Sequence, residues 1–320
     1  MLKQEGGRGM ARLMVVQGSG RKRGFTATLM EDVVEALKTV EGLDIDVHHL
    51  HNYTFGPCRS CFSCIRNVGS GCVQDDDWGR KGKGKLYKAF KRANGLLMVD
   101  PVHGWGSSAA ARVFIERIYP TFWEGTPYGL PFASISCASN QGFQNRAVEE
   151  FCKFSAAKGF RYIGGLPVHV AYLSDARKDA IALGLRLAEA ALADERNGRR
   201  KLSDEEIFLM YMDTPWSIVR GYLDNLTNGA FRYDTSVPVR ALRNGAFTSP
   251  EALPLLEKTC ESLKTALAWY HAGDTHAAAV ELAKTSKYWT NATYIQFLRD
   301  DVVKANMPKA YRPLDELEER

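Results

Sequence analysis

Four of the seven cysteines lie close together in the segment 57–78, where they could bind a metal centre. Their spacing is C-x2-C-x2-C-x7-C, and the residues are Cys58, Cys61, Cys64 and Cys72. Two-residue gaps in an irregular loop let successive sulfur atoms point at one small volume, as a multi-iron centre requires. Gly69 and Gly71 let the chain turn back and supply the fourth ligand. The spacing therefore favours an iron–sulfur cluster.

Two other interpretations of the cysteines stay open. Structural zinc usually takes two separated cysteine pairs, or one pair together with histidines, and the nearby histidines that could complete such a site are His48, His49 and His51. Bare or redox-active thiols are the second alternative. Disulfides are disfavoured because the sequence shows no sign of export, which predicts a reduced, cytoplasmic setting, and because they would leave the tight spacing unexplained.

Composition and charge narrow the class of protein. The 320 residues are 45% hydrophobic and 25% charged, as in ordinary soluble globular proteins. The net charge of +5 is too small to indicate nucleic-acid binding. No run of about 18 apolar residues occurs, so we expect no membrane span. We expect a cytoplasmic protein without nucleic-acid or membrane partners.

A second candidate for chemistry is the glycine-rich loop Gly18–Thr26, with the sequence GSGRKRGFT. It follows a short apolar run and precedes an amphipathic stretch. Backbone N–H groups, the hydroxyls of Ser19 and Thr26, and the charge of Arg21 together suit an anion. The spacing fits neither a Walker A loop nor G-x-G-x-x-G. An ordinary glycine-rich turn remains an alternative for this loop taken alone.

Apolar runs and helical patterns alternate along the first 200 residues. Strands are predicted at residues 12–17, 44–49, 95–99, 132–137 and 168–172, and Ser174 or Asp175 is expected to cap the last helix. This alternation indicates a parallel sheet covered by helices on both faces, with its ligand at the carboxyl ends of the strands. Three loops should converge there: Gly18–Thr26, Pro101–Ser108 and Ala138–Gly142.

We expect two domains. Residues 1–200 should form the α/β domain, with the cysteine loop 57–78 inserted in it. Residues 201–320 should form an all-helical extension, since no convincing strand pattern follows the polar joint Glu195–Glu206. The aromatic residues of the extension suit a core or a dimer interface, or alternatively a lid over the ligand.

Three motifs in order resemble one known family. These are G-S-x-R-x-x-G-x-T after the first strand, the cysteine run before Asp75–Asp76, and D-P-V-H-G-W after the third strand. Together they resemble the iron–sulfur flavoproteins, flavodoxin-fold relatives of the NAD(P)H-dependent FMN reductases, over residues 12–195. The resemblance implies a flavodoxin-like, doubly wound, five-stranded parallel sheet. Gly20 and Phe25 stand where the family usually has proline and asparagine.

The resemblance also implies cofactors and their ligands. The FMN phosphate is expected on the first loop and the isoalloxazine ring against the other two. The residues assigned by position are Ser19, Arg21, Gly24, Phe25 and Thr26, then Pro101, Val102, His103, Gly104 and Trp105, and finally Ser139 and Gly142. The four cysteines are expected to bind a 4Fe–4S cluster.

The function implied is that of an FMN- and 4Fe–4S-dependent oxidoreductase that reduces a small acceptor with electrons from NAD(P)H or ferredoxin. The basic run Arg80–Arg92 could dock an acidic ferredoxin or a nicotinamide phosphate, or be a solvated surface. A homo-oligomer, dimer or tetramer, is expected by analogy. The alternatives are a cluster-free NAD(P)H:flavin or quinone reductase, and a non-catalytic electron carrier or redox sensor.

Overall fold

The computed structural model describes residues 10–307. The chain divides into two compact units that interleave along the sequence. Unit 1 comprises the described residues up to Arg59 together with Gly71–Thr121 and Thr126–Lys201, and unit 2 comprises Ser60–Ser70, Phe122–Gly125 and the residues from Leu202 onward. The middle of the cysteine loop therefore belongs to the same unit as the C-terminal helices.

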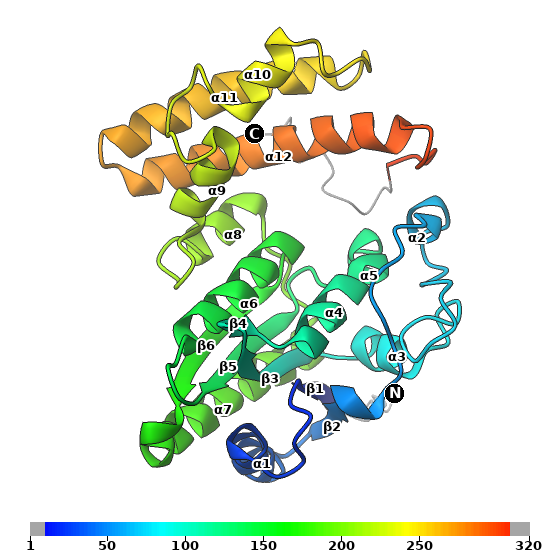
Figure 1. The fold of residues 1–320 in the computed structure, drawn as a ribbon, viewed down its shortest axis with the longest axis vertical. Helices are drawn as coiled ribbons and strands as arrows, with labels where there is room; N and C mark the ends of the chain where they lie inside the picture. Colours follow the sequence, from blue (N-terminus) through cyan, green and yellow to red (C-terminus); the bar gives the residue numbers. More distant parts are fainter. Residues whose placement is uncertain (1–9, 308–320) are drawn as a thin grey trace, which may run out of the picture. The chain divides into compact units, whose positions relative to one another are not determined.

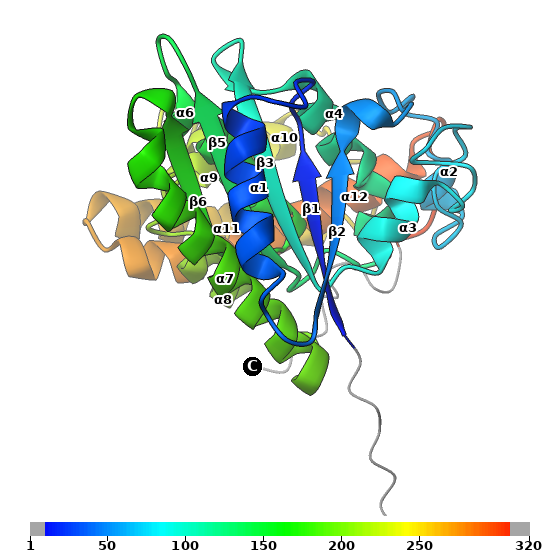
Figure 2. The ribbon, with the colours of Figure 1, turned by 90° about the horizontal axis from the view of Figure 1, so that it is seen from below.

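Unit 1 is built on a parallel sheet (Figures 1 and 2). Its five parallel strands are β1 (Ala11–Gln17), β2 (Leu43–His49), β3 (Gly95–His103), β5 (Pro131–Ala138) and β6 (Arg161–His169). They lie in the order β2-β1-β3-β5-β6, and the short β4 (Gly106–Ser107) pairs antiparallel with the end of β3. Counting only parallel strands, this is the 2-1-3-4-5 order of flavodoxin-like folds. The predicted fold class is confirmed.

Helices cover both faces of the sheet because alternate strand residues point to opposite sides. In β1, Leu13 and Val15 pack in one core cluster with residues of α1 (Phe25–Leu37) and α7 (Leu173–Asn197). Met14 and Val16 pack in a second cluster with residues of the helices on the other face. Those helices are α3 (Lys85–Lys91), α4 (Ala109–Arg117) and α6 (Gln144–Lys158).

The position of the last strand was predicted wrongly. β6 ends at His169, where residues 168–172 were expected to form the strand, and residues 170–172 form a 3-10 turn. The glycines and proline of the preceding sequence are typical of turns, but β6 is an edge strand, where Pro167 is tolerated. The helix α7 consequently begins at Leu173 and has no side-chain cap, so neither Ser174 nor Asp175 caps it.

Unit 2 is helical, and its described residues contain no strand. Its helices are α2 (Ser63–Arg66), α8 (Asp204–Met210), α9 (Ile218–Thr227), α10 (Val237–Arg243), α11 (Leu253–His271) and α12 (Thr275–Arg299), with the end of α5 (Tyr119–Trp123). A capping box between Ser203 and Glu206 fixes the start of α8. No helix in residues 10–307 is long and apolar enough to cross a membrane.

Candidate functional site

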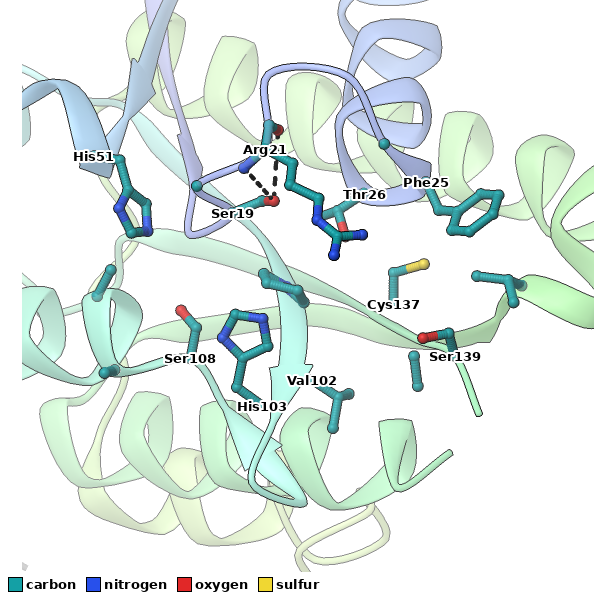
Figure 3. Close-up of a pocket in the computed structure, with 17 residues that line it drawn as sticks. Ser19, Arg21, Phe25, Thr26, His51, Val102, His103, Ser108, Cys137 and Ser139 are labelled. Atoms are coloured by element: carbon teal, nitrogen blue, oxygen red, sulfur yellow. Dashed lines mark hydrogen bonds between the residues drawn. The ribbon is translucent and has the colours of Figure 1, made fainter. Parts of the chain in front are cut away.

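Unit 1 has a cavity of about 550 Å³ at the carboxyl ends of its central strands. Residues of the loops after β1, β3 and β5 line it (Figure 3). β1 and β3 are neighbours in the sheet although β2 separates them in sequence, so the strand order reverses between them. The predicted convergence of the three loops is confirmed.

The wall that the loop after β1 forms is suited to an anion. The helix α1 begins at this loop without a side-chain cap, so its first N–H groups remain available. The guanidinium of Arg21 extends into the space beside Thr26 (Figure 3). The loop itself is held by the Arg21 N–H, which donates to the Ser19 hydroxyl oxygen at 3.1 Å. None of the residues that line the cavity is a carboxylate.

A buried carboxylate, Asp100, ties two of these loops together. Ser108 donates to it twice, from its backbone N–H at 2.7 Å and from its hydroxyl at 2.6 Å. The same Ser108 hydroxyl oxygen accepts from the N–H of Ala111 and so caps α4. Asp100 thereby fixes the chain on both sides of the loop 101–108. The sequence-based assignment missed Asp100, although a carboxylate ending an apolar strand could have indicated it.

The loop after β1 passes directly over Asp100. A Cβ atom added to Gly18 would lie 1.8 Å from Asp100 Oδ1, so only glycine permits this approach. Burial raises the pKa of Asp100 to about 7, against the opposing hydrogen bonds from Ser108. The carboxyl group that holds two loops of the cavity together therefore changes charge near neutral pH.

The loop after β2 contributes a residue that the sequence-based assignment placed elsewhere. His51, named above as a zinc ligand candidate, lines the cavity (Figure 3), and its Nε2 lies 3.2 Å from the carbonyl oxygen of Gly18. Because that oxygen can only accept, Nε2 carries the proton in this contact. The His51 ring lies beside Gly20, where an added Cβ would come within 3.3 Å of it. Nothing local in the sequence indicated this contact, which depends on β2 pairing with β1.

Nine of the twelve residues assigned to FMN line the cavity. They are Ser19, Arg21, Gly24, Phe25, Thr26, Pro101, Val102, His103 and Ser139. The lining also includes residues without an assignment: Gly20, His51, Ser108, Ala109, Ala110, Cys137, Ala138 and Val170. Among these, Cys137 stands at the end of β5, and burial raises the pKa of its thiol, which favours the neutral form.

The other three assigned residues lie outside the lining. Gly104 and Trp105 form the two-residue turn of the β3–β4 hairpin, with φ values of 55° and 64°. Trp105 is exposed and stacks on Phe143, with ring centroids 4.7 Å apart. Gly142 precedes Phe143 in the loop before α6. The hairpin is held by Glu150, which accepts from the N–H and the hydroxyl of Ser107 at 3.0 and 2.6 Å.

The cavity fits a phosphorylated, partly flat group such as FMN. Its volume is within the range of ordinary ligand pockets. An uncapped helix start and the Arg21 guanidinium suit a phosphate at one wall. Pro101, Val102 and His103 at the end of β3 supply a mixed apolar and polar wall for a ring system.

Unit 1 contains two of the four clustered cysteines. Cys58 is half-buried and lies in the wall of a second cavity of about 420 Å³, while Cys72 is buried. The Sγ atom of Cys72 accepts a hydrogen bond from Arg117 Nη2 at 3.4 Å. Arg117 is almost fully buried and also pairs with Asp76 at 2.6 Å. The Arg117 guanidinium therefore links the Cys72 sulfur to the Asp76 carboxylate within unit 1.

The other two clustered cysteines belong to unit 2. Cys61 is exposed and Cys64 is half-buried, and none of the seven cysteines forms a disulfide. Within residues 10–307, no three or more His, Cys, Asp or Glu residues are grouped so that they could hold a metal ion. The four cysteines of residues 57–78 are therefore not grouped as cluster ligands in this conformation, and a 4Fe–4S cluster remains a prediction from their spacing.

The three histidines considered as zinc ligands have other contacts. His48 contacts the Tyr53 hydroxyl at 2.7 Å and Asp46 at 2.9 Å. His49 bonds to the side chain of Gln17. Among the described residues, these histidines and the cysteines are not grouped as a zinc site.

Comparison with known proteins agrees with the site. Residues 11–158 match the family model of NADPH-dependent FMN reductases. An iron–sulfur flavoprotein of Methanocaldococcus jannaschii is 26% identical over 105 residues, which are 33% of this chain and 50% of that protein. The chain thus matches only about half the length of this curated relative.

The comparison with solved structures shows similarity of fold alone. A flavone reductase superposes with a TM-score of 0.43 and 14% identity, over 60% of this chain and 66% of its own. A WrbA-like flavodoxin of Agrobacterium tumefaciens superposes with a TM-score of 0.37 and 14% identity, over 57% and 97%. The sequence match and the strand order agree: residues 11–158 match the family model of NADPH-dependent FMN reductases, and unit 1 has the strand order of flavodoxin-like folds.

Proposed function

We propose that this protein is an FMN-dependent oxidoreductase that reduces a small acceptor with electrons from NAD(P)H or a ferredoxin, and that it carries a 4Fe–4S cluster. The observation that best supports the FMN site is the cavity at the strand-order reversal. One wall of this cavity carries the Arg21 guanidinium and no carboxylate, and the wall at the end of β3 combines the apolar Pro101 and Val102 with the polar His103. The match of residues 11–158 to the NADPH-dependent FMN reductase family model supports the same cofactor.

The residues of the cavity have distinct roles in this proposal. Arg21 and the first N–H groups of α1 bind the phosphate, and the Thr26 hydroxyl completes that wall. Pro101, Val102 and His103 hold the ring system. Bound FMN supplies the chemistry of taking electrons in pairs and releasing them singly.

Asp100 positions these groups without lining the cavity. It anchors Ser108, so the loop that carries His103 starts and ends at fixed points. It also contacts the glycine turn that leads to Arg21. Preorganisation of this kind reduces the ordering cost when a ligand binds.

The cysteines serve the proposed cluster. Cys58, Cys61, Cys64 and Cys72 would hold it, and it would carry one electron at a time. Arg117 donates a hydrogen bond to the Cys72 sulfur, and such bonds are one means by which proteins set cluster potentials. The weak similarity to an archaeal iron–sulfur flavoprotein supports the proposal.

Two alternatives give different results in the same test. A cluster-free NAD(P)H:flavin or quinone reductase would oxidise NAD(P)H without iron. An electron carrier or redox sensor would contain cofactors but show no NAD(P)H oxidation with any small acceptor. The ferredoxin partner and the homo-oligomeric state also remain predictions.

The test is anaerobic purification followed by assays of FMN, iron and acid-labile sulfide, with the absorption spectrum and NAD(P)H oxidation measured on the same sample. We expect about one FMN and about four iron atoms per chain. The variants Cys58→Ser, Cys64→Ser and Cys72→Ser should lose most of the iron and keep FMN. Cys152→Ser, at a buried cysteine of α6 outside the segment 57–78, is the matched control and should keep both.

FMN-free protein after reconstitution would refute the flavin site. Iron-free protein with bound FMN would refute the cluster and leave the cluster-free reductase. Equal loss of iron in Cys152→Ser and the loop variants would show that the loop cysteines are not specific ligands.

A further inference from the structure

Within unit 2, the middle of the cysteine loop contacts the end of the last helix. Arg66, the final residue of α2, donates from Nη1 to the carbonyl oxygens of Val302 and Val303 at 3.3 and 3.2 Å. Its Nη2 donates to the carbonyl oxygen of Cys61 at 2.7 Å. One guanidinium thus links the backbone of Cys61 to the turn that follows α12. Figures 1 and 2 both show α2 beside that end of α12.

A row of aromatic side chains makes a second connection. Phe62 meets Phe297 of α12 edge to face, with ring centroids 5.5 Å apart. Phe297 meets Tyr294 at 6.0 Å, and Tyr294 meets the buried Trp123 at 5.1 Å. All three contacts are near perpendicular, the geometry that aromatic pairs favour. The residue next to Cys61 is therefore packed on the C-terminal helix.

The loop has little local structure to hold it in this conformation. Ser60 and Phe62 have φ values of 49° and 55°, a left-handed conformation that is costly for a bulky side chain. The helix α2 has only four residues and no side-chain cap. A helix this short is unstable without tertiary contacts. The contacts of Arg66 and Phe62 with the end of α12 supply them.

We infer that the C-terminal helical extension is the scaffold of the middle of the cysteine loop, residues 60–67, and that Arg66 and Phe297 are positioning residues for Cys61 and Cys64. The consequence for metal binding rests on the proposed function, because it assumes that these cysteines bind the cluster. The inference that the extension holds residues 60–67 in place does not depend on the proposed function. The role inferred for the extension is to hold residues 60–67, which contain Cys61 and Cys64, two of the four proposed cluster ligands.

The test compares the full-length protein with Arg66→Gln and Phe297→Ala. Hydrogen–deuterium exchange of the amides in residues 60–67 is measured on the metal-free protein, and iron and FMN contents are measured after anaerobic reconstitution. We expect exchange in this segment to rise about tenfold, because each variant removes contacts of the order of a charged hydrogen bond or an aromatic pair. Iron per chain should fall by more than half, while FMN content stays unchanged.

Two further variants serve as controls. Arg220→Gln removes an exposed arginine of α9 in the same unit and should change neither quantity. Arg66→Lys keeps the charge but cannot reach three carbonyl oxygens at once, so its exchange should rise by an intermediate factor. Arg66 is exposed, so its variants should fold even if Phe297→Ala does not.

The outcomes separate the two proposals. Unchanged exchange in residues 60–67 of Arg66→Gln would overturn the scaffold inference, whatever the iron content. Faster exchange with full iron content would overturn the positioning role. If the wild-type protein binds no iron, the proposed cluster fails, and the exchange measurement still decides whether the extension holds the loop.

Discussion

The carboxyl group of Asp100 should make stability depend on pH in a characteristic direction. Burial raises its pKa from 3.8 to about 7 in the folded protein. At a pH between these two pKa values, the carboxyl group of Asp100 keeps its proton in the folded state and has lost it in the unfolded state. The stability from this proton is therefore complete below pH 4 and is lost as the pH rises through about 7.

The size of the effect follows from the shift. About three pKa units at 1.36 kcal/mol each give about 4 kcal/mol in total. Between pH 5 and pH 8 the linkage relation leaves a loss of about 3 kcal/mol in the free energy of unfolding. Asp100→Asn stays neutral at every pH and keeps the shape of the side chain, so this loss should disappear in the variant.

The assay is urea unfolding of both proteins at pH 5, 6, 7 and 8, followed by circular dichroism. The stability of the wild type relative to Asp100→Asn should fall from pH 5 to about pH 7 and level off above it. Asp179→Asn, at an exposed position of α7, controls for the removal of one charge and should follow the wild-type curve. Parallel curves for wild type and Asp100→Asn, or a wild type that gains relative stability with pH, would refute the reasoning.

Two further predictions concern the loop after β1. Gly18→Ala should destabilise the protein by about 1–3 kcal/mol in urea unfolding, because the added Cβ collides with Asp100. Gly56→Ala, which has open space around the position of its Cβ, should change the free energy of unfolding very little. Equal effects of the two substitutions would contradict the close approach at Gly18. Arg21→Gln should weaken FMN binding about ten- to hundredfold in a fluorescence titration, through loss of a charged hydrogen bond to the phosphate. Arg23→Gln, outside the cavity lining, should change the affinity less than threefold, and similar losses in both would indicate only general loop charge.

The βα pattern of the chain was readable without tertiary information. Buried strands leave continuous apolar runs, and the helices between them leave amphipathic periods, so four strands were located to within a few residues. The convergence of three loops followed from the general geometry of parallel sheets. β6 was misplaced because its tolerance of glycine and proline comes from its position at the sheet edge, which only the strand order reveals.

The sequence by itself determined the alternation of strands and helices, the glycine-rich loop after the first strand and the cysteine spacing, because each is a pattern of residues close together in the chain. Only the tertiary structure decided which distant residues support them. Asp100 meets Gly18, His51 joins the cavity wall, and Arg66 binds carbonyl groups 236 and 237 positions away. These contacts depend on strand pairing and helix packing, in which partners are brought together by burial of whole elements and not by any local pattern.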